Sequence, residues 1–143
     1  MNLADWEASV PQQIREDSLW RMEAYRLGLF LAELAMHDAK NLLGDRRTVA
    51  IADQLVRAAG NISSNISEGY SRGTGRDRAR FYEYALGSAR ETRDWYYKSR
   101  EVLKPEVIAH RIDLSTQIVR LTLKMVSNER RRNYRFNDPR AQP

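Results

Sequence analysis

The chain has 143 residues, of which 42% are hydrophobic and 30% are charged, and its formal net charge is +5. This length and apolar content predict one domain with a single core. Cysteine is absent, which excludes disulfides, thiolate metal sites and cysteine nucleophiles. No apolar run is long enough to span a membrane and the N-terminus lacks a signal-peptide pattern, so we expect a cytoplasmic protein without a membrane partner.

The first predicted element is an N-terminal arm over residues 1–16, where Pro11 argues against a long helix. A helix is then predicted from Asp17, a plausible N-cap, to a left-handed stop at Gly44. This helix has more apolar residues than one buried face would hold. They include Tyr25, Leu27, Leu29, Phe30 and Leu34.

The second predicted helix ends near Gly69 and repeats apolar residues at helical spacing. These are Ile51, Leu55, Ala58, Ile62 and Ile66. A parallel stripe consists of small residues, which would allow a neighbouring backbone to approach closely. Its members are Ala52, Ala59, Gly60, Ser63, Ser64 and Ser67.

The third predicted helix opens at Thr74, which can cap it, and carries the small residues Gly87, Ser88 and Ala89. We expect those three to meet the small stripe of the second helix. The fourth helix is predicted to begin at Pro105, which suits a first helical turn. From Arg130 onward the chain becomes basic and polar and is expected to fray.

The fold class that follows is all-α. Short links between long helices favour an antiparallel up-down-up-down four-helix bundle over residues 17–129, between the arm and a basic flexible tail over residues 130–143. The first and third helices have more apolar residues than a small bundle needs, which suggests a subunit interface and a homo-oligomer. The third helix contributes Tyr82, Tyr84, Leu86, Tyr96 and Tyr97 to this excess.

Positive charge is concentrated in two places, and the first is the turn before the third helix. Two glycines there free the backbone to aim N–H groups outward, and a helix N-terminus follows, which together suit a phosphate. The turn also carries a group of arginines: Arg72, Arg76, Arg78 and Arg80. The alternative is a turn that only connects two helices through solvent.

The second concentration is the tail, where arginines alternate with aromatic residues. The positions are Arg130, Arg131, Arg132, Tyr134, Arg135 and Phe136. Aromatic rings that stack on bases, combined with arginines that contact phosphates, are typical of single-stranded nucleic-acid binding. The alternative is a disordered tail that only keeps the protein in solution.

Catalysis has little support in the sequence. The two histidines, His37 and His110, lie on different predicted helices and neither has a metal-ligand spacing. The numerous serines lack a Gly-x-Ser-x-Gly elbow. We therefore expect no catalytic residue, no metal and no cofactor, and we expect the protein not to be an enzyme.

Asn65 and Glu68 form an unusual polar pair near the end of the second helix, where a carboxylate opposes the helix dipole. The structural interpretation pairs Glu68 with an arginine, for which the candidates are Arg57, Arg72 and Arg90. The alternative is a carboxylate used in chemistry, which would need a second acid or a metal.

The run Asn65-Ile66-Ser67-Glu68-Gly69, followed by Gly87-Ser88-Ala89-Arg90-Glu91, resembles the bacterial family named for reading frames in intervening sequences of 23S rRNA genes. The resemblance covers residues 25–126. It implies a four-helix bundle, ring-like homo-oligomers of pentameric form, and a fold-specifying role for the motif, with Gly87 and Ser88 among its positions. The family is also structurally similar to accessory proteins of diversity-generating retroelements, which bind nucleic acid and a reverse transcriptase.

Two functional hypotheses remain. The first is a non-enzymatic homo-oligomer that binds nucleic acid through the arginine-rich turn and tail, with structured RNA as the expected ligand and RNA preferred to DNA. The second is a protein-interaction scaffold that recruits a partner protein, such as a reverse transcriptase, with little direct affinity for nucleic acid. Salt dependence separates them, because phosphate contacts weaken steeply as salt rises.

Overall fold

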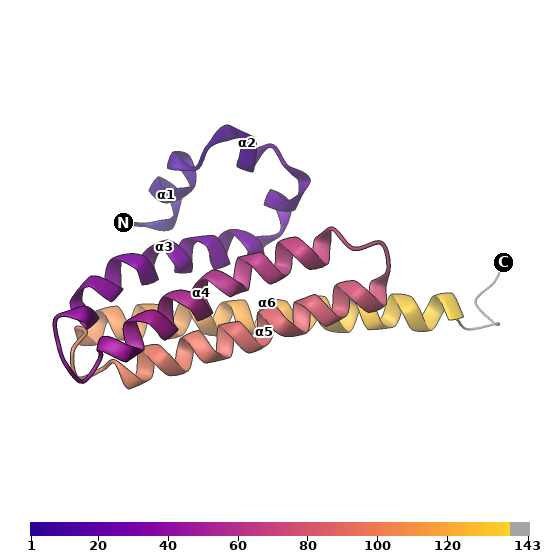
Figure 1. Ribbon diagram of the computed structural model, residues 1–143. Coiled ribbons are helices and arrows are strands. Elements are labelled where there is room, and N and C mark those ends of the chain that lie inside the picture. The colour runs from indigo at the N-terminus through magenta and orange to yellow at the C-terminus, as the bar shows by residue number, and fades with distance from the viewer. Residues whose placement is uncertain (138–143) are drawn as a thin grey trace.

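Four long helices form an antiparallel bundle in the computed structural model, which describes residues 1–137 (Figure 1). They are α3 (Glu23–Leu43), α4 (Val49–Tyr70), α5 (Gly75–Lys98) and α6 (Pro105–Asn137). Successive helices pack against one another, and α6 also contacts α3. Residues 1–137 contain no strand. The predicted all-α bundle is therefore confirmed.

The core follows the helical periodicity of the sequence. On α4 the predicted apolar positions Leu55, Ile62 and Ile66 are completely buried, and Ala58 is nearly so. Leu31 and Leu42 from α3 fill the facing layer, also without exposure. Burial of each such Leu or Ile side chain stabilises the fold by about 1.5–3 kcal/mol before entropic costs.

The N-terminal segment contains more structure than an arm. It comprises α1 (Leu3–Ser9), α2 (Gln12–Arg15) and the 3-10 helix η1 (Ser18–Arg21). The prediction that Asp17 caps the first long helix is wrong, because its Oδ1 accepts from the Leu19 amide at 2.9 Å and caps η1 instead. The first bundle helix therefore begins later, at Glu23.

This N-terminal segment covers one face of α3. The Trp6 ring centroid lies 5.2 Å from that of Phe30 and 6.1 Å from that of Trp20. An ion pair between Glu7 and Arg26, 3.4 Å apart, ties α1 to α3. The second apolar face of the first helix is therefore buried within one chain.

The excess apolar residues of the third helix are also largely explained inside the chain. Tyr82 and Tyr96 are buried in the core, whereas Tyr84 and Tyr97 are exposed. Together with the covered face of α3, this removes most of the sequence argument for a subunit interface. The homo-oligomer stays a prediction.

The starts of α5 and α6 match the sequence prediction, whereas the ends of α3 and α6 do not. The Asp77 amide donates to Thr74 Oγ1 at 3.2 Å, which confirms the cap of α5, and α6 begins at Pro105 as predicted. Gly44 does follow α3, but its φ of −79° is right-handed, so the predicted left-handed stop is wrong. Helix α6 continues to Asn137, past the fraying predicted from Arg130, and its ion pairs with α5 at this end are those of Glu129 and Arg130.

The close approach of α4 and α5 occurs at Gly69 rather than at Gly87. A Cβ added at Gly69 would lie 2.7 Å from Tyr82 Cε1, whereas one added at Gly87 would meet nothing within 4 Å. Ala89 is fully buried as predicted, but Gly87 is exposed and Ser88 is half-buried. The predicted contact of Gly87 with the second helix is therefore wrong.

No helix among the described residues combines the length and apolar character needed to cross a membrane.

Candidate nucleic-acid interface

The two basic segments of the sequence lie at the same end of the bundle. The α4–α5 turn and the C-terminal part of α6 are neighbours there, as Figure 1 shows. Arg78 Nε lies 3.1 Å from Glu129 Oε2, and Arg130 forms an ion pair with Glu83. Both ion pairs cross between α5 and α6. The two basic segments, predicted as separate sites, are therefore neighbours at one end of the bundle, and we call residues 68–84 and 129–132 the arginine end.

Arg78 is a structural member of this group. Its side chain is half-buried against Glu129, and its Nη1 donates to the Arg72 carbonyl oxygen at 3.1 Å. The charge of Glu129 also acts on Tyr82, whose pKa is raised to about 12 first by burial and then by that carboxylate. Arg78 thus joins the turn to α6 and is poorly placed to contact a ligand.

Arg72 and Arg80 are exposed and flank an aromatic ring. Their guanidinium carbons lie 4.7 Å and 5.1 Å from the centroid of the Phe81 ring. Arg72 also pairs with Glu68 at 3.3 Å, which confirms the structural interpretation of that carboxylate. Arg80 lies 3.8 Å from Asp77. Solvent-exposed pairs of this kind are weak and can exchange for a phosphate.

Arg76 and Arg131 are exposed and make no ion pair or hydrogen bond with another described residue. Arg132 is also exposed and lies 3.7 Å from Glu129. Within the described part of the arginine end, arginines outnumber carboxylates. The arginines are Arg72, Arg76, Arg78, Arg80, Arg130, Arg131 and Arg132, and the carboxylates are Glu68, Asp77, Glu83 and Glu129. The surplus is a positive field that attracts polyanions.

The backbone of the turn differs from the expected phosphate cradle. No glycine among the residues the structure describes has a positive φ, so Gly73 and Gly75 do not adopt the left-handed geometry that builds a nest of amides. The N-terminus of α5 still presents unpaired amides beside Arg76. The attraction for an anion therefore comes mainly from side chains.

The side chains of residues 133–137 lie outside the described residues, including those of Tyr134, Arg135 and Phe136. Their predicted role in stacking and phosphate contact stays a prediction.

The motif residues on α4 have structural partners. The Asn65 side chain donates to the Asn61 carbonyl at 2.8 Å, and Glu68 pairs with Arg72 as described. Gly69 makes room for Tyr82. On α5 the carbonyl of Ser88 accepts from Thr92 Oγ1 at 2.7 Å. These contacts fix the packing of helices and suggest no chemistry.

A buried polar cluster at the opposite end was missed by the sequence analysis. Asp38 Oδ2 accepts from the Tyr96 hydroxyl at 2.8 Å and from Arg111 Nε at 2.8 Å, which joins α3, α5 and α6. Burial and the charge of Asp38 raise the pKa of Tyr96, and burial and Arg111 lower the pKa of His110. The available signal was the position of Asp38 on the apolar stripe through Leu31 and Leu42.

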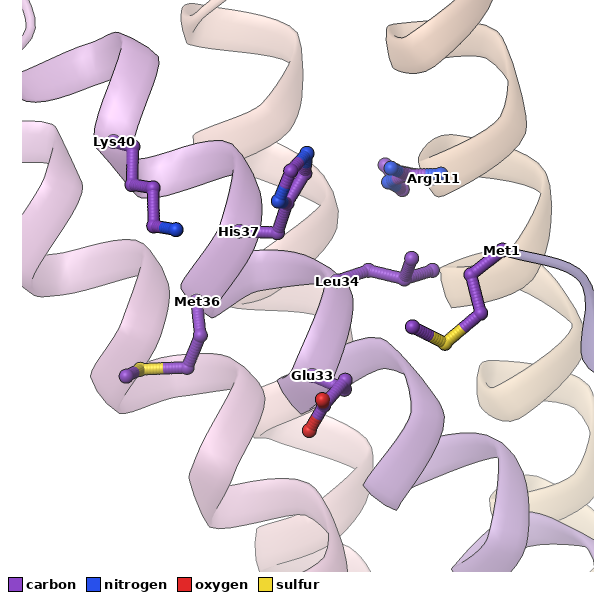
Figure 2. Close-up of a pocket in the computed structure, with 7 residues that line it drawn as sticks. All are labelled: Met1, Glu33, Leu34, Met36, His37, Lys40 and Arg111. Atoms are coloured by element: carbon purple, nitrogen blue, oxygen red, sulfur yellow. The ribbon is translucent and has the colours of Figure 1, made fainter. Parts of the chain in front are cut away.

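A pocket of about 690 Å³ opens beside this cluster, between α3, α6 and the N-terminus (Figure 2). Its lining residues are Met1, Glu33, Leu34, Met36, His37, Lys40 and Arg111. Arg111 is already neutralised by Asp38, and the described residues contain no group of acidic or histidine side chains that could hold a metal. The residues that line the pocket offer no nucleophile–base pair.

Comparison with known proteins gives a family and a fold. A sequence profile of the 23S rRNA-intervening sequence protein family matches residues 21–124. The chain is also similar to the crystal structure of a protein of unknown function from the S23 ribosomal protein family of Bacteroides thetaiotaomicron. The two are 22% identical with a TM-score of 0.67, and the match covers 72% of this chain and 97% of the other. No curated protein matches the chain.

Proposed function

This chain belongs to the 23S rRNA-intervening sequence protein family, and we propose that it is a non-enzymatic homo-oligomer that binds RNA, in preference to DNA, through its arginine end. The site of action is the cytoplasm. The ion pairs Arg78–Glu129 and Arg130–Glu83 carry the proposal, because they bring both basic segments to one surface.

The arrangement suits a polyanion better than a single small anion. Arg76, Arg131 and Arg132 are exposed on two different helices, so successive phosphates of one strand can each meet a guanidinium. The weak pairs of Arg72 and Arg80 add charge that a phosphate can recruit. Release of counterions from RNA then drives binding with little dependence on sequence.

Self-association is the second part of the proposal. Met36 is 61% exposed and Leu43 is 59% exposed, and they lie two turns apart on one face of α3. Burial of this face in a pentameric ring would place several arginine ends around one axis and strengthen the positive field.

The test reverses charge at the arginine end while the fold is kept. We expect Arg76→Glu with Arg131→Glu to weaken binding of a labelled RNA and to keep the fold, because both residues are exposed and neither makes an ion pair or hydrogen bond with another described residue. If each contacts one phosphate of a single strand, the slope of log affinity against log salt should fall by about 1.4. The matched control is Arg46→Glu with Lys104→Glu, in the two exposed connections at the opposite end.

Equal loss in both double variants would point to net charge alone and contradict a localised site. Absence of binding by the intact protein at low salt, to any RNA or DNA, would favour the scaffold that recruits a partner protein. In that case, the expected ligand of the arginine end would be an acidic surface of a partner protein.

A further inference from the structure

Resting on the proposed function, we propose that Tyr84 and the neighbouring Arg72–Phe81–Arg80 group form a base-stacking platform, so that the ligand of the arginine end is RNA with unpaired bases rather than duplex RNA.

The platform is assembled before any ligand arrives. The rings of Phe81 and Tyr84 meet edge to face, with centroids 5.6 Å apart and an interplanar angle of 88°. Phe81 is half-buried and anchors the pair, while Tyr84 is 51% exposed. The guanidiniums of Arg72 and Arg80 lie over the Phe81 ring. Rings and guanidiniums held in place by one another lose little freedom on binding.

The surface beside Tyr84 is open because the next turn of α5 carries Gly87. A helical side chain leans toward the N-terminus, so a side chain at position 87 would lie over the preceding turn, where Tyr84 sits. A Cβ at Gly87 would meet nothing within 4 Å, which shows free space there. Glycine lowers the stability of a helix interior relative to other residues. No close contact in the structure requires a glycine at position 87. The consequence of Gly87 is that one face of the Tyr84 ring stays uncovered.

The platform also has charge along the same helix face. Arg76, Arg80 and Tyr84 follow one another at intervals of one turn, so the ring lies in line with two cations. A nucleotide whose base stacks on Tyr84 can therefore place flanking phosphates near Arg80 and Arg76. This spacing joins stacking to backbone contact, as in proteins that bind single strands.

Duplex RNA cannot use such a platform. Its bases are stacked within the helix, and its deep, narrow major groove does not admit side chains. A duplex would meet the arginines through phosphates alone. An unpaired strand would gain stacking in addition, and each stacked base strengthens binding roughly 5- to 150-fold.

The experiment compares a labelled single-stranded RNA of about 12 nucleotides with a duplex of the same length, by fluorescence anisotropy in one buffer. We expect Tyr84→Ala to weaken single-strand binding about 5-fold or more while duplex binding and both salt slopes stay unchanged. Tyr84→Phe should retain single-strand binding, because its ring still stacks. The control is Tyr97→Ala, which removes a 55% exposed ring near the other end of α5 that also carries a guanidinium, that of Arg100 at 4.2 Å.

A second variant tests whether weaker binding comes from loss of stacking or from loss of stability. Gly87→Gln should raise the melting temperature, because glutamine favours a helix over glycine, and should still weaken single-strand binding by covering Tyr84. The platform would be refuted if Tyr84→Ala left single-strand affinity unchanged. It would also be refuted if Tyr84→Ala lowered the affinities for single strand and duplex by the same factor. If that result comes with binding that remains sensitive to Arg76→Glu, the proposed function survives; if neither RNA binds the intact protein, both fail.

Discussion

Gly69 offers the sharpest test of the bundle, because two glycines of one motif should respond to the same substitution with opposite sign. Gly69→Ala places a methyl carbon 2.7 Å from Tyr82 Cε1, 2.9 Å from its Cδ1 and 3.0 Å from Phe81 Cβ. Tyr82 is 3% exposed, so its ring has little space to move away. Gly87→Ala adds the same methyl group to an exposed site with no neighbour within 4 Å.

The magnitudes follow from two opposing terms. Alanine favours a helix interior over glycine by about 0.5–1 kcal/mol, which applies in full at Gly87 and less at Gly69, the last residue but one of α4. Overpacking against Tyr82 costs about 1–3 kcal/mol, and only at Gly69. We therefore expect Gly87→Ala to stabilise the protein by up to about 1 kcal/mol, and Gly69→Ala to destabilise it by up to about 2 kcal/mol.

Urea unfolding followed by circular dichroism measures both changes, at one fixed protein concentration because assembly would shift stability. In thermal melts, each kcal/mol corresponds to roughly 3–4 °C for a chain of this size. Equal effects of the two variants, or a stabilised Gly69→Ala, would show that α4 and α5 do not approach closely at Gly69.

Three further predictions concern burial, pH and assembly. Asp38→Ala should destabilise the protein in urea unfolding by less than the loss of about 3–5 kcal/mol for a fully buried pair, because it leaves the half-buried Arg111 without its carboxylate and the Tyr96 hydroxyl without its acceptor. The raised pKa of Tyr82, to about 12, means that the fold favours its neutral form. This stabilisation is present below about pH 10 and is lost as the pH rises toward 12, so Tyr82→Phe should reduce the alkaline fall in stability and leave the part due to Tyr96. Light scattering at micromolar concentration should give a mass several times the 16.7 kDa of one chain, and Met36→Glu should lower it; a clean monomer would contradict the ring.

Local signals in the sequence were sufficient to predict the bundle. Leu55, Ile62 and Ile66 recur at helical spacing and are all buried, and Pro105 and Thr74 mark helix starts through their own backbone chemistry. Each of these inferences depends on residues close in the chain, where periodicity and capping decide the outcome.

These local signals did not predict contacts between segments that are far apart in the sequence. The packing of Trp6 on Phe30 depends on how the arm folds back, and no pattern in residues 1–16 specifies that. The part of α6 at Glu129 and Arg130 likewise contacts α5, through ion pairs with Arg78 and Glu83. Local composition predicted fraying from Arg130, and helix α6 continues to Asn137.

The candidate site was predicted in part. The arginines were found from charge alone, but charge could not show that Arg78 binds Glu129 inside the protein while Arg76 stays exposed. The exposed Tyr84 was assigned to a subunit interface, because the sequence does not distinguish it from the buried Tyr82. That distinction requires the phase of α5 against its neighbours.

The most direct test of the arginine end as an RNA-binding surface is ultraviolet crosslinking to a single-stranded RNA, followed by identification of the crosslinked peptides. We expect crosslinks on the segment from Arg72 to Tyr84 and on residues 129–132 of α6, where Glu129 and Arg130 pair with that segment. Added unlabelled single strand should remove these crosslinks. Crosslinks confined to the opposite end, around Arg46 and Lys104, would contradict the account.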